Sequence, residues 1–279
     1  RGSDGLLKAD PRYWLFEDWC DLPKNATPTF LNLWHLYAET LYCKLLHHAG
    51  CEADAQKLEA KIAAERKLLA EAFFVPEIGK DGRQNGVPSV HDQVLALLLE
   101  LRPEAKDSMI EKRILPCLKG TLSGCAEPSS FWSTYLLDAA QMYGLRAEAL
   151  EYIRREWAKM VPTGTAWETF GKGDYSGWSY SHAWSAHPLS HLPELVFGVK
   201  QTEDAWRRVE FSPLFTAPDS AELVLPTPQG TIRASLKRSG QTAELDFEIP
   251  AGMCAQIRLP GETIRTNGEA AVISRKLSV

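Results

Sequence analysis

Apolar residues between positions 28 and 198 recur with a period near 3.6, which places them on one face of an α-helix. Capping residues mark several helix ends. Ser89 follows a proline where one apolar run begins, and Gly50 and Gly144 stand where runs stop. The pattern predicts seven helices, over residues 28–49, 54–74, 89–101, 106–118, 129–143, 146–160 and 181–197.

The connections between these helices alternate in length. Helices joined by a short turn run antiparallel, so the long connections all fall at one end of the assembly, together with residues 13–27. Loops gathered on a rigid helical frame often carry function, and we expect the site at this end. The short connections are 50–53, 102–105 and 144–145, and the long ones are 75–88, 119–128 and 161–180.

This alternation is typical of helix hairpins stacked in a ring, an α/α toroid. Seven helices do not close a ring of six hairpins, so we expect residues 1–208 to form a partial (α/α)6 toroid. An open arc would leave apolar helix faces exposed to water. It therefore predicts either a homodimer or a partner chain that covers the arc.

From about Val209 the apolar period changes to two, the pattern of β-strands. Proline and glycine clusters at 226–230 and 239–240 are turn signals. We expect residues 209–279 to form a small antiparallel β-sandwich, which makes the fold mainly α with a β domain. The predicted strands are 221–225, 230–236, 242–249, 255–259, 263–266 and 271–274.

Composition narrows the possible partners. The 279 residues are 44% apolar and 24% charged, a balance typical of a folded globular chain. The net charge of −5 comes without any block of like charge, so we expect neither nucleic acid nor a membrane as partner. The six cysteines lack C-x-x-C spacing, and no dinucleotide, phosphate-loop or H-E-x-x-H motif is present. We therefore expect no metal and no cofactor.

Tryptophans concentrate in stretches that lack the periodic pattern of a helix, and one of these stretches contains a glutamate. Glu168 follows Trp167, and a Gly/Tyr/Trp-rich loop with Trp178 leads on to His182. A carboxylate beside an aromatic wall suits work as a general base, and sugar hydrolysis uses two such carboxyl groups. Glu168 could equally cap or pair with a nearby group. His182 could donate to a sugar hydroxyl or orient Glu168, or serve structure alone.

A second candidate lies before the first predicted helix. Asp18 could hold two adjacent hydroxyls while Trp19 stacks on the face of a pyranose. The alternative is an ordinary loop carboxylate beside a packed aromatic ring. Both residues belong to the end of the assembly where the long connections are expected, so a carbohydrate is the expected ligand.

Four motifs in register resemble the α-L-rhamnosidases of glycoside hydrolase family 78 over nearly the whole chain. Residues 13–19 look like the family's tryptophan-ending segment, and 90–96 resemble a later helix start. Residues 165–170 followed by 181–186 look like its W-E and S-x-x-H-x-W-S region. The turn at 226–230 and the stretches 249–252 and 259–260 are similar to its C-terminal domain.

The resemblance implies an (α/α)6 barrel, an inverting mechanism and a terminal L-rhamnose or similar sugar as substrate. It also implies that Glu168 is the general base and that Trp19, Trp167 and His182 line the sugar pocket. The family's general acid belongs to an Asp/Arg/Glu-rich motif upstream of the Trp19 segment, and this sequence contains nothing like it. Substitutes within the chain would be Glu17 and Asp21.

Three hypotheses follow from these residues. The chain could be part of a rhamnosidase-like glycosidase whose acid lies elsewhere. It could instead be a non-catalytic carbohydrate-binding or structural remnant. It could also belong to an (α/α)6 hydrolase that acts on another sugar. The sequence indicates no cellular compartment.

Overall fold

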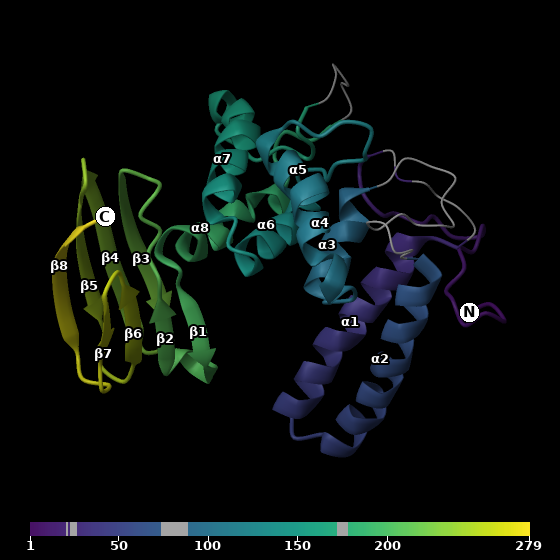
Figure 1. Cartoon of the computed structure of the whole chain (residues 1–279), viewed down its shortest axis with the longest axis horizontal. Coiled ribbons are helices and arrows are strands. Elements are labelled where there is room, and N and C mark those ends of the chain that lie inside the picture. The colour runs from purple at the N-terminus through teal and green to yellow at the C-terminus, as the bar shows by residue number, and fades with distance from the viewer. Residues whose placement is uncertain (21, 23–26, 74–88, 172–177) are drawn as a thin grey trace. The chain divides into compact units, whose positions relative to one another are not determined.

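A computed structural model describes residues 1–20, 22, 27–73, 89–171 and 178–279 of the chain (Figure 1). The chain forms two compact units, each discontinuous in sequence. The first combines Arg1–Tyr143 with Arg155–Ala186, and the second combines Gly144–Arg154 with His187–Val279. The domain boundary expected after residue 208 stays a prediction.

Seven helical segments are present in the described chain, as the apolar period predicts. The last begins later than expected, because Ala183–Ala186 form a 3-10 turn and Pro188, which has no N–H to donate, occupies the first helical position. The helices are α1 Thr29–His48, α2 Glu52–Phe73, α3 Val90–Leu98, α4 Lys106–Met109 running through a π turn Ile110–Ile114 into α5 Leu115–Lys119, α6 Ser133–Met142, α7 Arg146–Trp157 and α8 Pro188–Phe197.

The core of the first unit is centred on α3. Helices α1 and α2 form a pair, α1 packs on α3, and α3 packs on α6. All eight α3 residues from Val90 to Leu97 are buried, so α3 lies among other elements on every side. Leu33 and Leu36 of α1 and Leu136 of α6 are fully buried, each worth about 1.5–3 kcal/mol. No helix in the described ranges is both long and apolar enough to cross a bilayer.

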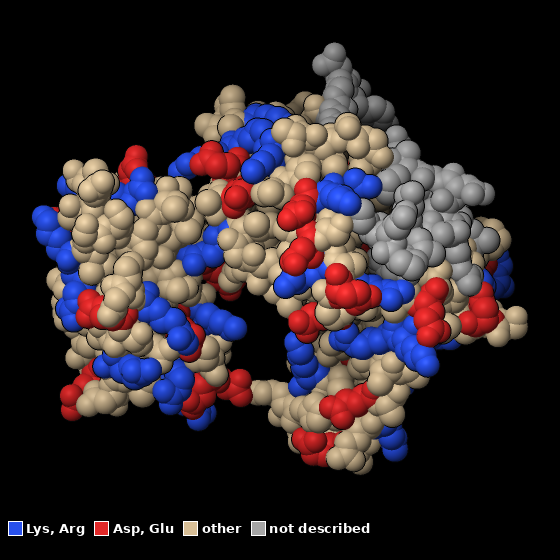
Figure 2. Space-filling model, viewed as in Figure 1, with Lys and Arg blue, Asp and Glu red and all other residues tan. Residues whose placement is uncertain are grey.

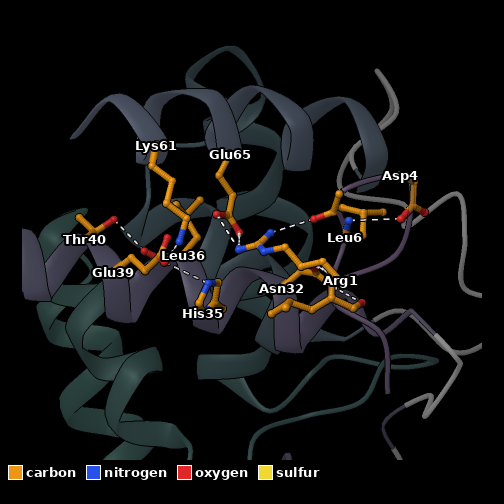
Figure 3. Close-up of polar contacts among 12 residues, drawn as sticks. Arg1, Asp4, Leu6, Asn32, His35, Leu36, Glu39, Thr40, Lys61 and Glu65 are labelled. Atoms are coloured by element: carbon orange, nitrogen blue, oxygen red, sulfur yellow. Dashed lines mark hydrogen bonds and ion pairs between the residues drawn. The ribbon is translucent and has the colours of Figure 1, made fainter. Parts of the chain in front are cut away.

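The segment before α1 is bound to the α1–α2 pair (Figure 3). The Arg1 guanidinium donates to both carboxylate oxygens of Glu65 on α2, each at 2.9 Å. The Asn32 side chain accepts from the Leu7 N–H at 2.8 Å and donates to the Leu7 carbonyl at 3.1 Å. Leu6 is completely buried between these contacts. The segment is therefore part of the folded unit.

A second polar cluster joins α1 to α2 beside this segment. Glu39 accepts a hydrogen bond from Lys61 of α2 and pairs with His35 one turn earlier at 3.1 Å. Burial acts to raise the pKa of Glu39, but the hydrogen bond from Lys61 and the nearby positive charges outweigh it, and the pKa is lowered. The cluster therefore favours the ionised carboxylate in the folded state.

Some apolar side chains of α1 and α6 face solvent. Leu41, Tyr42 and Leu45 of α1 and Met142 of α6 are exposed. The homodimer or partner chain expected to cover such faces stays a prediction. On the face drawn in Figure 2, Lys and Arg side chains are interspersed with Asp and Glu.

The second unit holds two four-stranded sheets, in the orders β1-β2-β6-β7 and β3-β4-β5-β8. Phe211 of β2 and Phe247 of β5 contact each other with ring centroids 5.2 Å apart, which joins the two sheets through one core. Alternation is clearest in β5, where Leu245 and Phe247 are buried and the intervening residues are exposed. The strands are β1 Lys200–Glu203, β2 Arg208–Phe211, β3 Ser220–Thr227, β4 Gly230–Ser239, β5 Thr242–Ile249, β6 Cys254–Leu259, β7 Glu262–Arg265 and β8 Ala271–Ser278.

All six predicted strands are confirmed, and two more precede them. β1 and β2 have four residues each. Every residue of β1 is exposed, so β1 gives no alternating signal in the sequence. β2 does alternate, with Val209 and Phe211 buried, but it was not among the predicted strands. β2 pairs with β6 in parallel, which departs from the purely antiparallel sandwich expected. The other strand pairs in the described chain are antiparallel.

Arg146 at the start of α7 connects three backbone segments of the second unit. Its guanidinium donates to the carbonyls of Leu195 at 2.9 Å, Val196 at 3.3 Å and Ser212 at 2.8 Å. The last turn of α8 and the residue that follows β2 therefore bind the same cation. Burial lowers the pKa of Arg146.

We predict that Arg146→Lys lowers the free energy of unfolding by about 2 kcal/mol, because one ammonium group cannot reach three diverging carbonyls. Urea denaturation of the whole chain measures this. Arg154→Lys on the same helix is the matched control, since the exposed Arg154 contacts only Glu151 in the described structure. Equal stability of the two variants would contradict the role given to Arg146.

We also predict that Glu39→Gln lowers stability at pH 7 by up to about 1 kcal/mol, an effect that disappears in acid. The folded state lowers the pKa of Glu39 below its ordinary 4.5, so its contribution is present above that value and is lost as pH falls through the folded pKa. Denaturation curves between pH 3 and 7 test this. Glu71→Gln, at an exposed position on α2, should show no such pH dependence.

Candidate functional site

Three segments far apart in the sequence meet in the first unit. They are residues 16–20 before α1, residues 127–131 before α6, and residues 167–171 and 178–184 before α8. The first and second are joined through Asp18, and the second and third through Ser130. Part of the expected convergence of long connections is thus observed, while residues 75–88, 172–177 and Asp21 lie outside the described ranges.

Asp18 is the point where the first two segments join. Its side chain has no exposed area, and it accepts hydrogen bonds from the backbone N–H of Ser129 at 2.8 Å, from Trp19 N–H at 2.7 Å and from the Ser129 hydroxyl. His91 at the start of α3 contacts it through Nε2 at 2.8 Å. A buried carboxyl group needs such partners to replace the hydrogen bonds it would make with water. Asp18 therefore lies behind the surface, and its expected contact with a sugar stays a prediction.

The aromatic side chains of these segments pack on one another. Trp19 contacts Trp178 edge to face with centroids 4.8 Å apart. Phe16 lies parallel to Trp184 at 6.2 Å, and Phe131 contacts the same indole at 4.9 Å. We call this set the aromatic wall: Phe16, Trp19, Phe131, Trp178 and Trp184.

Glu168 is held by hydrogen bonds from the loop that follows it and from the segment before α6. Its Oε2 accepts from the Ser179 N–H at 2.9 Å, and its backbone N–H donates to the Ser179 carbonyl at 2.9 Å. Its carbonyl accepts from the Ser130 hydroxyl at 2.7 Å and from the Trp184 indole at 2.9 Å. Oε1 has no donor in the described part of the chain. The carboxylate is thus oriented on one oxygen and available on the other.

His182 and Trp167 occupy positions around Glu168. The His182 ring stacks on Trp184 with centroids 3.9 Å apart, and its backbone N–H donates to the Ala166 carbonyl at 2.8 Å. The Trp167 indole donates to the Thr163 hydroxyl at 2.7 Å, and its ring contacts Tyr180. The substrate-binding roles predicted for both residues stay predictions.

A cavity of about 230 Å³ lies beside the aromatic wall. It is smaller than the roughly 300–1,000 Å³ that drug-sized ligands occupy, a size suited to a single sugar ring. Two of the predicted site residues, Trp19 and Trp178, line it, and Glu168 directly precedes a third lining residue, Thr169. The other lining residues, Cys20, Glu127, Pro128, Ser129 and Phe170, were not singled out from the sequence.

Two thiols lie near Glu127. Burial, and then the nearby Glu127 carboxylate, raise the pKa of Cys117 well above its ordinary value. Burial also raises the pKa of Cys125 to about 11. Both thiols are therefore protonated at neutral pH, and Cys117 Sγ lies 3.8 Å from Glu127 Oε2 as a weak donor. Glu17, one of the two proposed substitutes for the missing acid, is only 1% exposed.

Comparison with known proteins defines the class of the second unit. Residues 198–274 match the family described as the bacterial α-L-rhamnosidase C-terminal domain. This range contains all eight strands except the end of β8. The sandwich is therefore similar to the C-terminal domain of bacterial α-L-rhamnosidases. No curated protein matched the chain.

Solved structures extend the relationship to the helices. A family 78 rhamnosidase of Bacillus sp. GL1 aligns with 93% of this chain at 26% identity and a TM-score of 0.80. An α-L-rhamnosidase of Aspergillus terreus aligns with 99% at 18% identity and a TM-score of 0.81, a likeness of fold. The chain spans 29% and 34% of these two proteins. The chain is thus related to the α-L-rhamnosidases of glycoside hydrolase family 78, and the resemblance inferred from its motifs is confirmed.

We predict that Asp18→Asn lowers the free energy of unfolding by about 2–3 kcal/mol, because an amide cannot accept at both positions and a buried donor loses its partner. The tryptophan near-ultraviolet circular dichroism should weaken as the aromatic wall loosens. Asp10→Asn is the control, since among the described residues the Asp10 carboxylate bonds only to Arg12. A variant at Asp18 as stable as the one at Asp10 would show that the first two segments are held together by other contacts.

Proposed function

We propose that this chain is the base-bearing part of a glycoside hydrolase that removes terminal α-L-rhamnose or a similar sugar with inversion. The observation that carries the proposal is the arrangement around Glu168. One carboxylate oxygen is fixed by Ser179, and the loop is attached through Ser130 to the segment that lines the cavity. The family relationship supplies the reaction type.

In this proposal Glu168 accepts a proton from a water molecule, whose oxygen attacks the anomeric carbon as the bond to the leaving group breaks. Oε1 is the oxygen available for that water. Trp19 and Trp178 present apolar surface to the ring face and reduce the access of bulk water.

The general acid is proposed to come from residues outside this chain, since the family's acid motif has no counterpart in the sequence. In inverting enzymes the two carboxyl groups lie about 6.5–9.5 Å apart, which leaves room for the attacking water. Removing general-acid assistance costs about 10²–10⁴ in rate for a poor leaving group. A phenolate that leaves without protonation avoids most of that cost.

We therefore predict that the chain hydrolyses an aryl α-L-rhamnoside with a nitrophenolate leaving group, and that Glu168→Gln reduces the rate by about 100-fold or more. Methyl α-L-rhamnoside should be cleaved far more slowly. Glu151→Gln, at an exposed position on α7, is the matched control. If Glu168→Gln and wild type hydrolyse the aryl substrate equally slowly, Glu168 is not the base.

The same assay separates the alternatives. Sugar binding without hydrolysis that depends on Glu168 would favour a carbohydrate-binding remnant. Faster hydrolysis of an aryl glucoside than of the aryl rhamnoside would favour a related hydrolase of other specificity.

A further inference from the structure

Glu127 is the one carboxylate among the described residues that line the 230 Å³ cavity. It stands immediately before Pro128 and Ser129, two further lining residues, in the connection that leads into α6. Asp18, expected from the sequence to bind hydroxyls, has both of its oxygens occupied by protein donors. The oxygens of Asp18 are therefore already hydrogen-bonded within the protein, whereas Glu127 lines the cavity.

The surroundings of Glu127 leave its carboxylate with little hydrogen bonding from the protein. Its partner within the described structure is the Cys117 thiol at 3.8 Å, a weak donor that stays neutral at physiological pH. None of the ion pairs in the described structure includes Glu127. A half-buried carboxylate with so few protein donors is stabilised by the hydrogen-bond donors of a bound ligand.

The rest of the cavity lining fits a sugar. Trp19, Trp178 and Phe170 supply aromatic surface, on which the C–H bonds of a pyranose pack. Thr169 adds a hydroxyl beside the base-bearing Glu168. An ionised carboxylate accepts hydrogen bonds from two adjacent hydroxyls at once, and phosphates and purely apolar ligands do not offer that pair of donors.

We propose that Glu127 is the sugar-recognition carboxylate of this cavity and accepts hydrogen bonds from two neighbouring hydroxyls of a single pyranose. The inference rests on the proposed function and deepens it, because it assigns a specificity residue that is distinct from the base. Asp18 then acts as a positioning residue that holds Trp19 and Ser129 in place.

The test is calorimetric titration of the chain with L-rhamnose, using wild type, Glu127→Gln, Glu127→Ala and Trp178→Ala. We expect Glu127→Ala to weaken binding by about 10- to 100-fold and Glu127→Gln to weaken it less, since the amide keeps one acceptor. Glu111→Gln, an exposed charge change on the π turn, is the matched control and should bind as wild type does. Thermal unfolding confirms that each variant is folded.

A deoxy analogue that lacks one of the bound hydroxyls separates direct contact from an indirect effect. The ratio of wild-type to Glu127→Ala affinity should be smaller for that analogue than for L-rhamnose, because part of the interaction is already absent. A merely structural role would give the same ratio for every analogue, and that result would overturn the proposal.

Failure of this inference differs from failure of the proposed function. If Trp178→Ala abolishes binding while both Glu127 variants bind normally, the cavity holds sugar, Glu127 is not its ligand, and the proposed hydrolase stands. If wild type binds neither L-rhamnose nor another monosaccharide, the cavity is not a sugar site and both proposals fail.

Discussion

A carboxylate side chain withdrawn completely from water constrains the arrangement of this unit. Asp18 accepts from Trp19, from Ser129 twice and from His91, so residues from before α1, before α6 and in α3 all supply donors. Removing a charge from water costs several kcal/mol unless donors of this kind replace the solvent. The three elements cannot separate without leaving that charge unsatisfied, and the cavity is built in front of this junction.

The adjacent residues Ser129 and Ser130 extend that junction to the candidate base. Ser129 bonds to Asp18, while the hydroxyl of Ser130 donates to the Glu168 carbonyl and accepts from the Ser185 hydroxyl at 2.8 Å. Two consecutive side chains thus connect the Trp19 segment to the Glu168 loop. The positions of the aromatic wall and of the base are consequently coupled, although they are about 150 residues apart in the sequence.

Much of this organisation could be predicted from the sequence, because it follows from periodicity. The change from a helical period to alternation located the helices and six strands, and the alternation of connection lengths indicated which loops would meet. The strand β1 was missed because all its residues are exposed and nothing alternates. The parallel pairing of β2 with β6 depends on contacts between distant strands, which no local pattern specifies.

Some residues of the candidate site could likewise be predicted from the sequence, and others could not. Trp19 and Trp178 were found because tryptophan in a loop is unusual, whereas Glu127 resembles any surface glutamate until the cavity is known. For Asp18, an acidic residue before a tryptophan, the expected ligand contact stays a prediction, and its protein partners, 73 and 111 residues away in the sequence, could not be read from any local pattern. Which carboxylate is available to a ligand is decided by long-range hydrogen bonding.

The contacts that orient Glu168 all come from this chain. Ser179, Ser130 and Trp184 hold the residue through its carboxylate and its carbonyl, and each belongs to the first unit. Catalysis by a positioned base requires that its orientation be fixed before the substrate arrives, since reorganisation during the reaction would raise the barrier. On the proposed function, the chain therefore contains a preorganised base and a sugar-sized cavity as one folded piece. The chain must still receive a proton donor from elsewhere. A leaving group of low basicity removes that need, because it departs without being protonated.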